Sequence, residues 1–420
     1  MNRRPISVRK FRAHSVLSIL AIVASAAPAP AEDLIGLYLM WQRDPATTMT
    51  INWVDPYADS SDTVWYRPYE SNEWSIAKAL QASVGHMTLQ LRRLELTKLK
   101  PDTLYEFGIG DSTDEVSHFW RFRTMPATLN RPIRFAEGGD MMHSRAMLDE
   151  MNAQMQRLDP DFAMFGGDLA YENGVHGTRW IDWLQSYRQY SVGKDQRLIP
   201  MVIGIGNHEV RGGYRGRAPE DAPYFYSIFA LPGGRSNYVL DFGDYLSLVM
   251  LDSGHSQPIA DQTEWLDKTL ADRADQQFLF AGYHYPAYGT TKAPRGGLPI
   301  DAPVAMEIRK QWIPHFERYG LSAAFEHDHH NFKRSHRIRN HQRDDENGLL
   351  YVGDGAWGVK TREVPDLKIA WWLAKAEPRN HLWHVEVRPN GTATLQAVDL
   401  SGEVFDEVEL DRSRTTPVQQ

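Results

Sequence analysis

The amino-acid sequence predicts an all-β sandwich domain followed by an α/β domain. The chain has 420 residues, of which 42% are hydrophobic, so it can bury a large core and exceeds the usual size of one domain. Between residues 34 and 124, about seven short runs alternate apolar with polar residues, as Met49, Ile51 and Trp53 do, which is typical of a small β-sandwich. After a linker at 126–132, strand-like and helix-like segments alternate, which predicts an α/β domain.

The second domain begins with three candidate buried strands, each followed by a polar loop, at 133–136, 162–165 and 201–205. Between the first two, one segment places apolar side chains at helical spacing: Met147, Leu148, Met151, Met155 and Leu158 within 144–158. We expect these methionines to pack in the core. Further on, we expect a helix at 262–273 and strands at 238–242, 246–251, 278–281, 381–388, 392–398 and 404–410, the last three forming an antiparallel set.

The first 31 residues have the pattern of a cleavable secretory signal. Five basic residues precede an apolar stretch at 16–24, and Ala29-Pro30-Ala31 offers a cleavage site before Glu32. The apolar stretch is too short to span a bilayer comfortably, and no later segment does better, so an uncleaved anchor is the weaker alternative. We therefore expect a secreted or periplasmic protein.

The composition argues against several functions. Removal of the five basic residues of the signal leaves 41 of the 46 Lys and Arg against 54 Asp and Glu, a formal charge of −13. Such a charge argues against a dedicated nucleic-acid surface or a basic membrane patch, whereas bound cations would still permit an anionic substrate. The chain has no cysteine, so oxygen and nitrogen atoms would have to hold any metal. An exported protein without disulfides suits a bacterial periplasm or exterior.

Five short segments carry the chemistry, and each follows a predicted strand. They are Gly139-Asp140, Gly167-Asp168-Leu169-Ala170-Tyr171, Gly206-Asn207-His208-Glu209, Tyr283-His284-Tyr285-Pro286 and His327-Asp328-His329. In open α/β sheets the loops at the carboxyl ends of the strands converge, so side chains far apart in the sequence can meet there. Carboxylates, a phenol, an amide and imidazoles in such loops are what two adjacent metal ions need.

The residue types in these segments favour metal binding. A glycine precedes both Asp140 and Asp168, which lets the backbone turn sharply and bring a carboxylate close to an ion, although either aspartate alone could cap a helix. Tyr171 lies three residues beyond Asp168, and a phenolate is a hard donor that suits ferric iron. Asn207 would bind through its amide oxygen.

The histidines complete this set. His327 and His329 are two residues apart, so in extended backbone they project to one side and can reach two ions that share a bridge. His284 by itself could equally be an ordinary loop histidine.

Taken in order, the patterns Gly-Asp, Gly-Asp-x-x-Tyr, Gly-Asn-His-Glu, x-x-His and His-x-His resemble the purple acid phosphatases of the calcineurin-like metallophosphoesterase superfamily. The plant and many bacterial members of that family also carry a fibronectin type III-like domain before the catalytic domain, and residues 99–105 resemble the tyrosine corner of such a domain. The resemblance implies a fibronectin-like sandwich at 32–126, a catalytic domain at 127–412 whose two-sheet β-sandwich core is flanked by helices, and a flexible tail at 413–420.

The resemblance also implies the ligands. A ferric ion would be held by Asp140, Asp168, Tyr171 and His329, and a divalent ion (zinc, iron or manganese) by Asp168, Asn207, His284 and His327, with Asp168 as the bridge. Two such ions can deprotonate a water, and the metal-bound hydroxide would attack the phosphorus of a small phosphate monoester.

Three residues are expected to contact the substrate. His208 would stabilise the transferring phosphoryl group and protonate the leaving oxygen as the catalytic acid, or alternatively orient the metal ligands. Asn207 would lie beside it against the substrate. His143 could contact the substrate or a ligand.

Some residues depart from the family pattern. Met142 and Glu326 each stand where the family usually has glycine, and an extra residue sits in 330–334. Glu326 could hold a ligand imidazole or be a solvated loop carboxylate. The loop after His284 lacks the histidines of plant members and offers other groups that could contact phosphate: Tyr288, Lys292 and Arg295.

Three functions therefore compete. The first is an exported dinuclear-metal phosphatase of phosphate monoesters. The second is a phosphodiesterase on the same scaffold, which the altered substrate loop permits. The third is a surface-binding protein with a weakly active catalytic domain, although a complete ligand set argues against it.

Overall fold

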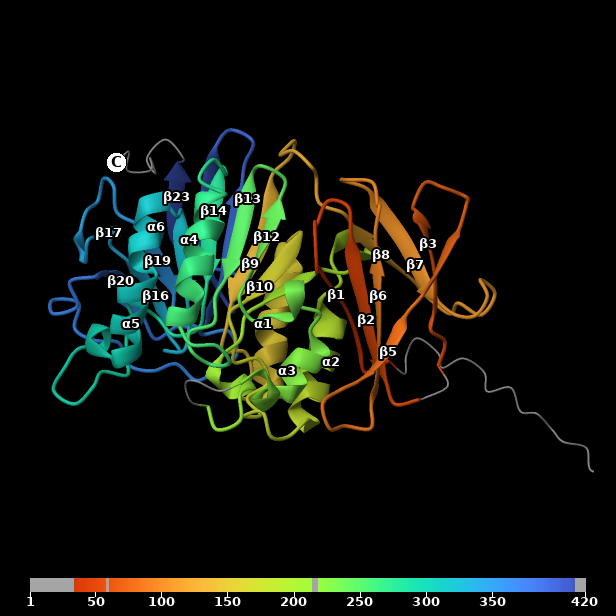
Figure 1. Cartoon of the computed structure of the whole chain (residues 1–420), viewed down its shortest axis with the longest axis horizontal. Helices are drawn as coiled ribbons and strands as arrows, with labels where there is room; N and C mark the ends of the chain where they lie inside the picture. Colours follow the sequence, from red (N-terminus) through yellow and green to blue (C-terminus); the bar gives the residue numbers. More distant parts are fainter. Residues whose placement is uncertain (1–33, 58–59, 214–217, 412–420) are drawn as a thin grey trace, which may run out of the picture.

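The computed structural model describes residues 34–57, 60–213 and 218–411, so the predicted signal at 1–31 and the predicted tail at 413–420 lie outside the described residues. Within these ranges the framework consists of two large β-sheets, a four-stranded sheet and a two-stranded hairpin (Figure 1). No helix in the described ranges is long and apolar enough to cross a bilayer. The predicted order, an all-β domain followed by an α/β domain, is confirmed.

The first domain is a sandwich of two antiparallel sheets, as predicted. The sheet orders are β1-β2-β6-β5 and β4-β3-β7-β8, with the strands β1 (Gly36–Met40), β2 (Met49–Asp55), β3 (Thr63–Pro68), β4 (Ser75–Lys78), β5 (Leu80–Ser83), β6 (Gln90–Leu96), β7 (Leu104–Ile109) and β8 (Phe119–Arg123). At the corner before β7, the Tyr105 hydroxyl accepts a hydrogen bond of 2.9 Å from the Lys100 amide, and the Tyr105 ring stacks on Phe122. This tyrosine pins the turn in the way that the sequence suggested.

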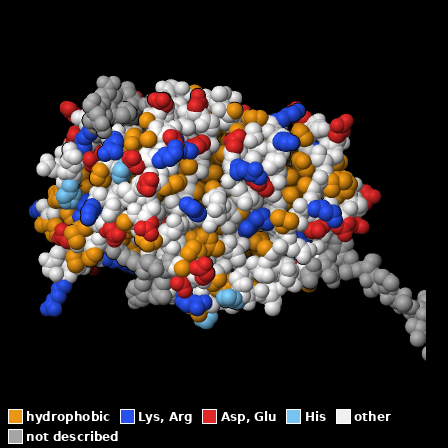
Figure 2. Space-filling model, in the orientation of Figure 1, with side chains coloured by type: hydrophobic (Ala, Val, Ile, Leu, Met, Phe, Trp, Pro, Cys, Tyr) orange, Lys and Arg blue, Asp and Glu red, His pale blue; other side chains and the backbone are white. Residues whose placement is uncertain are grey.

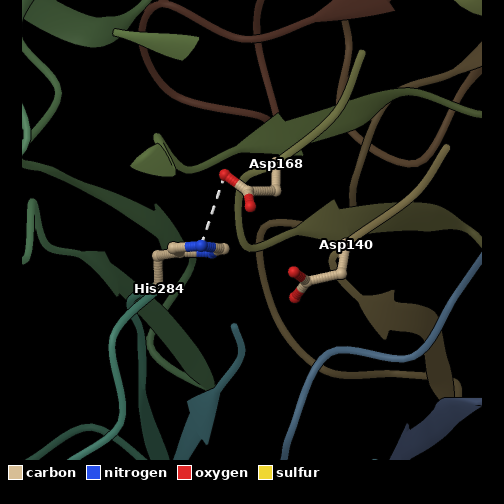
Figure 3. A group of neighbouring side chains, drawn as sticks. All are labelled: Asp140, Asp168 and His284. Atoms are coloured by element: carbon tan, nitrogen blue, oxygen red, sulfur yellow. Dashed lines mark ion pairs between the residues drawn. The ribbon is translucent and has the colours of Figure 1, made fainter. Parts of the chain in front are cut away.

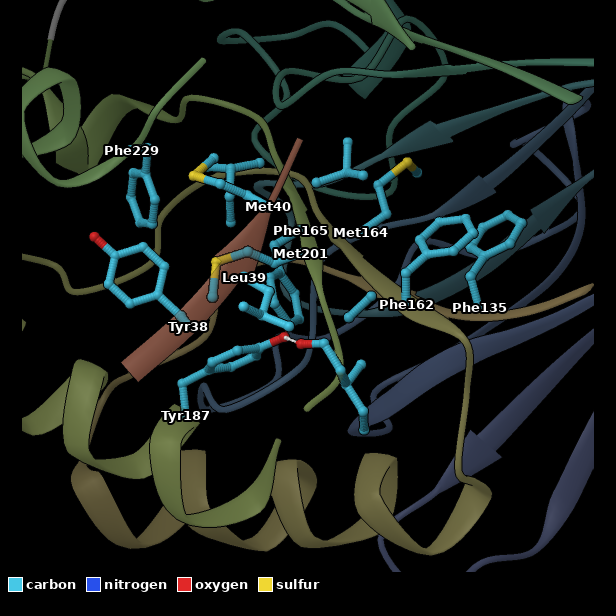
Figure 4. Close-up of a cluster of buried hydrophobic side chains, with 14 of the residues drawn as sticks. Tyr38, Leu39, Met40, Phe135, Phe162, Met164, Phe165, Tyr187, Met201 and Phe229 are labelled. Carbon is cyan, nitrogen blue, oxygen red and sulfur yellow. Dashed lines mark hydrogen bonds between the residues drawn. The ribbon is translucent and has the colours of Figure 1, made fainter. Parts of the chain in front are cut away.

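The two domains share one continuous sheet, which the sequence did not predict. Its order is β23-β22-β21-β9-β10-β11-β1-β2-β6-β5, and the second domain contributes β9 (Ile133–Gly138), β10 (Phe162–Phe165), β11 (Met201–Ile203), β21 (His381–Val387), β22 (Thr392–Asp399) and β23 (Val404–Asp411). β9, β10 and β11 are parallel, and β1 continues the parallel pairing where Met40 lies opposite Met201. Figure 4 shows this junction, with Tyr38, Leu39 and Met40 packed beside the buried side chains of the second domain.

A second sheet of seven strands packs face to face on the ten-stranded one. It has the order β12-β13-β14-β15-β19-β16-β20, with β12 (Tyr238–Phe242), β13 (Leu246–Met250), β14 (Phe278–Gly282), β15 (Ala323–Glu326), β16 (Phe332–Ser335), β19 (Leu350–Gly353) and β20 (Leu373–Glu377). Between the sheets, Phe135 of β9 meets Phe280 and Phe325 with ring centroids 6.1 and 6.2 Å apart. β17 (Ile338–Arg339) and β18 (Gln342–Arg343) form a separate hairpin, which a β-bridge between Ile338 and Leu349 joins to the start of β19.

Helices bury their apolar faces against the outer sides of the two sheets. α1 (Arg145–Leu158) and α2 (Thr178–Tyr190) belong to the core of the ten-stranded sheet, and α4 (Thr263–Ala271), α5 (Pro303–Gln311) and α6 (Ile313–Tyr319) to that of the seven-stranded sheet. The short α3 (Pro223–Ile228) packs near β1, where the Ile228 carbonyl accepts a hydrogen bond of 2.6 Å from Tyr38. α1 starts where we expected, since Ser144 caps it, and Met151 and Met155 are buried core residues.

Charged side chains of both signs share the face that Figure 2 shows. On that face acidic and basic side chains are intermixed, and apolar side chains lie scattered between them.

His381 should make the stability of the fold depend on pH. This side chain is 2% exposed between Phe332 and Trp383, and burial lowers its pKa from 6.5 to about 4. The unfolded chain takes up the proton below pH 6.5, but the folded chain stays neutral down to about pH 4. The contribution of His381 to stability is therefore full above pH 6.5 and falls by up to roughly 1.4 kcal/mol per pH unit as the pH drops toward 4.

Urea denaturation of the wild type and of His381→Phe between pH 4.5 and 7.5 measures this effect. We expect the free energy of unfolding of the variant to fall less steeply below pH 6.5. Equal slopes for the two proteins would contradict the assignment.

Candidate metal centre

The loops at the carboxyl ends of β9, β10, β11, β14 and β15 converge at one edge of the facing sheets, as expected for open α/β sheets. Asp140, Asp168 and His284 each direct one donor atom to a common point, with these atoms within 4.8 Å of one another (Figure 3). All three side chains are at most 1% exposed. Buried groups of this kind need partners, and a cation between them satisfies all three.

One side of this group consists of a carboxylate, a phenol and an imidazole. The Tyr171 hydroxyl donates to Asp140 Oδ1 at 2.9 Å. His330 Nε2 lies 3.0 Å from the same carboxylate oxygen and 3.1 Å from the Tyr171 hydroxyl. Three donor atoms from three loops thus face one point beside Asp168.

The other side centres on the imidazole of His284. Its Nε2 lies 3.3 Å from Asp168 Oδ1, 3.2 Å from Asn207 Oδ1 and 3.6 Å from Asp328 Oδ1. Its Nδ1 lies 3.0 Å from the Gly166 carbonyl oxygen, which can only accept a hydrogen bond. Because Nδ1 donates there, Nε2 faces the three oxygens as the atom available for a cation.

The backbone of this region is unusual. Five residues on the two sides of this group have a positive φ, which is uncommon outside glycine. They are Asp140 (57°), Asp168 (54°), Tyr171 (57°), Asp328 (74°) and His330 (59°). Left-handed residues cluster at functional sites, where the surrounding structure holds them against their preference.

The structure does not bring His327 into the group, so its predicted role as a ligand is corrected. His327 Nε2 lies 2.6 Å from Glu137 Oε1, and Nδ1 lies 2.9 Å from the Tyr283 carbonyl. Both ring nitrogens of His327 are thus occupied by hydrogen-bond partners outside the group. Although burial opposes it, Glu137 holds the pKa of His327 above its ordinary value.

His329 is also directed away from the group, and its predicted role is corrected in the same way. Its Nδ1 accepts hydrogen bonds from the backbone amides of Thr290 and Thr291 at 3.0 and 2.9 Å. The residues one position later, Asp328 and His330, occupy the places that we expected for His327 and His329. The spacing of two residues is kept, but the first of the two ligand candidates is a carboxylate.

The side chain of His208 lies on the open side of the group. Its backbone amide donates to Asp168 Oδ1 at 2.7 Å, and its ring packs on Tyr171 with the centroids 4.4 Å apart. Nδ1 is hydrogen-bonded to Asn173 Oδ1. The side chain is 32% exposed, in contrast to the buried Asp168, so it can meet a substrate.

His143 lies behind the same group. Its ring edge contacts Tyr171 and His330 with centroids 5.1 and 5.3 Å apart, and its Nδ1 accepts a hydrogen bond from the Lys360 amide at 3.0 Å. Burial, and then the neighbouring His330, lowers the pKa of His143 to about 4. His143 therefore packs as a neutral ring against two residues of the group.

Two buried glutamates hold the loops in place. Glu209 accepts hydrogen bonds of 2.7 and 2.8 Å from the amides of Asp168 and Leu169, and one of 2.8 Å from Gly206, so it joins the loops after β10 and β11. Burial, and then the charge of Asp168, raises its pKa to about 7.

Glu326 is the second of these glutamates. It neither holds a ligand imidazole nor lies in solvent, which were the two roles that we expected. It is fully buried, pairs with Lys333, and accepts hydrogen bonds of 2.7 Å from both the Tyr283 hydroxyl and the Ala287 amide. It thus fixes the loop after His284 without touching a histidine of the group. In that loop, Lys292 Nζ lies 2.5 Å from Asp328 Oδ1, whereas Arg295 is exposed.

The electrostatics of the group depend on its compensating cations. Burial would raise the pKa of Asp168, but His284 and His208 outweigh it and lower that pKa. Against the same effect of burial, His284 and Lys292 hold the pKa of Asp328 well below its usual range. Burial, and then the carboxylates around it, raises the pKa of Tyr171 well above its ordinary value, so a phenolate forms here only when a cation replaces the proton.

Comparison with known protein families agrees with this geometry. Residues 35–124 match the N-terminal domain of purple acid phosphatases, and residues 133–331 match the calcineurin-like phosphoesterases. A purple acid phosphatase from yellow lupin seeds superposes with a TM-score of 0.72 at 17% identity, over 89% of this chain and 73% of the lupin chain.

Similar sequences occur in bacteria, plants and mammals. An uncharacterised protein of Mycobacterium tuberculosis is 23% identical over 72% of this chain and 62% of its own length. Purple acid phosphatase 15 of Arabidopsis thaliana is 27% identical over 63% of this chain and 53% of its own length. Mouse tartrate-resistant acid phosphatase type 5 is 24% identical over 63% of this chain and 82% of its own length. The chain thus spans less than two thirds of the mycobacterial and Arabidopsis relatives.

The match over residues 133–331 assigns the second domain to the calcineurin-like phosphoesterases. With the N-terminal domain included, the chain belongs to the purple acid phosphatase family, whose members are hydrolases of phosphate esters.

The buried pair of Glu137 and His327 should be structural. Replacing His327 by leucine leaves the Glu137 carboxylate buried without its partner, so we expect the free energy of unfolding to fall by about 3–5 kcal/mol. Urea denaturation measures this loss. The double variant with Glu137→Leu should regain part of it, because two apolar side chains leave no unpaired charge. A single variant as stable as the wild type would be inconsistent with the pair.

Proposed function

We propose that this protein is an exported phosphatase that hydrolyses phosphate monoesters at a centre of two metal ions, one ferric and one divalent. The observation that supports it most is the pair of donor sets that share Asp168: Asp140, Asp168, Tyr171 and His330 on one side, and Asp168, Asn207, His284 and Asp328 on the other. Export rests on the basic and apolar N-terminal segments, and an uncleaved N-terminus in the purified protein would contradict it.

The donor atoms fit the ions that we propose. The first set has two carboxylates, a phenol oxygen and one imidazole nitrogen, which are hard donors that suit ferric iron. The second set has three oxygens and one imidazole nitrogen. Since carboxylate and amide oxygens suit manganese, Asp328 favours manganese or ferrous iron over zinc there. Ions held by these residues would supply Lewis-acid chemistry, which lowers the pKa of a bound water and polarises a phosphate oxygen.

The residues of the chain itself would position and protonate the substrate. Asn207 and His208 are partly exposed, whereas Asp140 and Asp168 are buried beneath them, so the substrate approaches from the side of Asn207 and His208. Asn173 Oδ1 accepts a hydrogen bond from His208 Nδ1, which leaves Nε2 to carry a second proton toward the substrate. That proton would go to the leaving oxygen as its bond to phosphorus breaks.

The metal content of three variants tests the ligand sets. Asp328→Ala and His330→Asn should each lower the content from two ions per chain to about one, because each removes a donor from a different set. His329→Asn is the matched control: its amide oxygen can still accept the Thr290 and Thr291 hydrogen bonds, so two ions should remain.

Elemental analysis of the purified proteins, together with the visible absorption of a ferric phenolate, provides the measurement. Loss of metal from His329→Asn, with retention in His330→Asn, would restore our original assignment and contradict the revised one. A colourless wild type with one metal ion or none would contradict the dinuclear centre itself.

Substitution of His208 separates catalysis from metal binding. His208→Ala should lower kcat for a phosphate monoester by about 10²-fold or more, because a proton donor to the leaving group is lost. The metal content should not change, since it is the backbone amide of His208 that bonds to Asp168. Steady-state hydrolysis of a monoester and a diester reporter, with metal analysis of the same samples, measures both. Unchanged turnover would exclude the acid role, and faster hydrolysis of the diester would favour a phosphodiesterase.

A further inference from the structure

A cavity of about 400 Å³ opens beside the candidate metal centre. It is lined on one side by Asp328 and on another by Gly213, where a Cβ atom would lie 3.7 Å from the side-chain nitrogen of Asn207. Tyr285 and Pro286, which follow directly after His284, form a third part of the wall. The cavity therefore includes Asp328 of the second donor set, and its wall continues into segments next to Asn207 and His284.

The far wall of the cavity is apolar and rigid. It comes from the turn before α5 and the start of that helix, with Pro299, Ala302, Pro303 and Val304 facing inward. Three of the residues that line the cavity are prolines, whose φ is fixed. The Tyr285 ring packs against His255 with centroids 4.6 Å apart, so this wall is held from behind as well.

The charged groups of the cavity are few and already paired. Among its described lining residues the charged side chains are Lys292 and Asp328, which lie 2.5 Å apart as an ion pair. A second phosphate group in the cavity would meet a carboxylate and a lysine that this carboxylate already neutralises. Strongly anionic ligands need several free cationic donors, and the described lining residues, which also include His329, supply no lysine or arginine besides Lys292.

We propose that this cavity holds the alcohol part of the substrate and that the protein prefers phosphate monoesters of an aromatic or other compact apolar alcohol over polyphosphorylated ones. The inference rests on the proposed phosphatase function, since it places the phosphate at the two donor sets. The size is sufficient, because a cavity of about 150 Å³ with apolar walls already accepts benzene. The aromatic ring of Tyr285 and the proline faces supply the apolar contact.

Filling the cavity tests this inference. Val304→Trp places a large side chain into it from the first turn of α5, and Met306→Trp on the same helix is the matched control, since Met306 is 49% exposed and does not line the cavity. Phenyl phosphate and ethyl phosphate serve as the two substrates. Comparing each variant with the wild type on the same substrate cancels the different intrinsic reactivities of the two esters.

We expect Val304→Trp to lower kcat/KM for phenyl phosphate at least tenfold and to leave ethyl phosphate within about twofold, with Met306→Trp unchanged on both. Thermal melting verifies that both variants are folded. An equal loss on both esters, or no loss on either, would overturn the inference.

Binding provides a second measurement that does not depend on turnover. Calorimetry with the metal-loaded protein should show phenylphosphonate binding at least tenfold more tightly than methylphosphonate, and Val304→Trp should remove this difference. Equal binding of the two phosphonates by the wild type would overturn the cavity assignment while leaving the proposed function intact. If neither phosphonate binds and neither ester is hydrolysed, the proposed function fails and the inference fails with it.

Discussion

The mutual repulsion of three buried carboxylates is the constraint around which the centre is organised. Asp140, Asp168 and Asp328 are at most 3% exposed; the first two share a group of donor atoms with His284, and Asp328 Oδ1 lies 3.6 Å from His284 Nε2. Like charges in a poorly solvated interior repel one another strongly, so the fold has to supply positive charge between and around them. Lys292 supplies part of it, and cations bound between the carboxylates and His284 would supply the rest. An arrangement that serves no cation would be a costly way to build a protein interior.

The rest of the molecule keeps these groups from moving apart. The Asp328 amide donates to Asp140 Oδ2 at 2.8 Å, so two of the repelling loops are tied directly to each other. Glu209 joins the loops after β10 and β11, and Glu326 with Lys333 fixes the loop after β14. The parallel strands of the two facing sheets end at the same edge. The loops that carry the donor residues therefore converge because of the sheet topology and not because of the local sequence.

The sequence predicted those parts of the site that depend on local backbone signals. It did not predict the ligands whose identity depends on contacts with residues far away in the chain. The Gly-Asp turns and the segment around Asn207 predicted the place of the group, because strand ends converge in any open α/β sheet. The alternation of side chains in extended backbone suggested His327 and His329, but Asp328 and His330 adopt left-handed backbone, and Glu137, nearly two hundred residues away, occupies His327. The His329-His330 doublet allowed both registers, and only the packing decides between them. The local sequences of β1 and β11 likewise do not indicate that these two strands pair.

The continuous sheet makes the catalytic domain depend on the N-terminal sandwich, because β1 covers the edge strand β11. An unpaired strand edge is a template for aggregation, and sheets are usually protected by charge, by bulges or by a covering element. Here β1 occupies the edge of β11, and the main-chain carbonyls of Leu34 and Ile228 are further bonded by Arg188 and Tyr38 across the same junction. The sandwich thus shields a hazardous edge of its neighbour. Loss of the N-terminal sandwich through recombination or truncation would expose the edge of β11, which gives selection a reason to keep both domains in one chain.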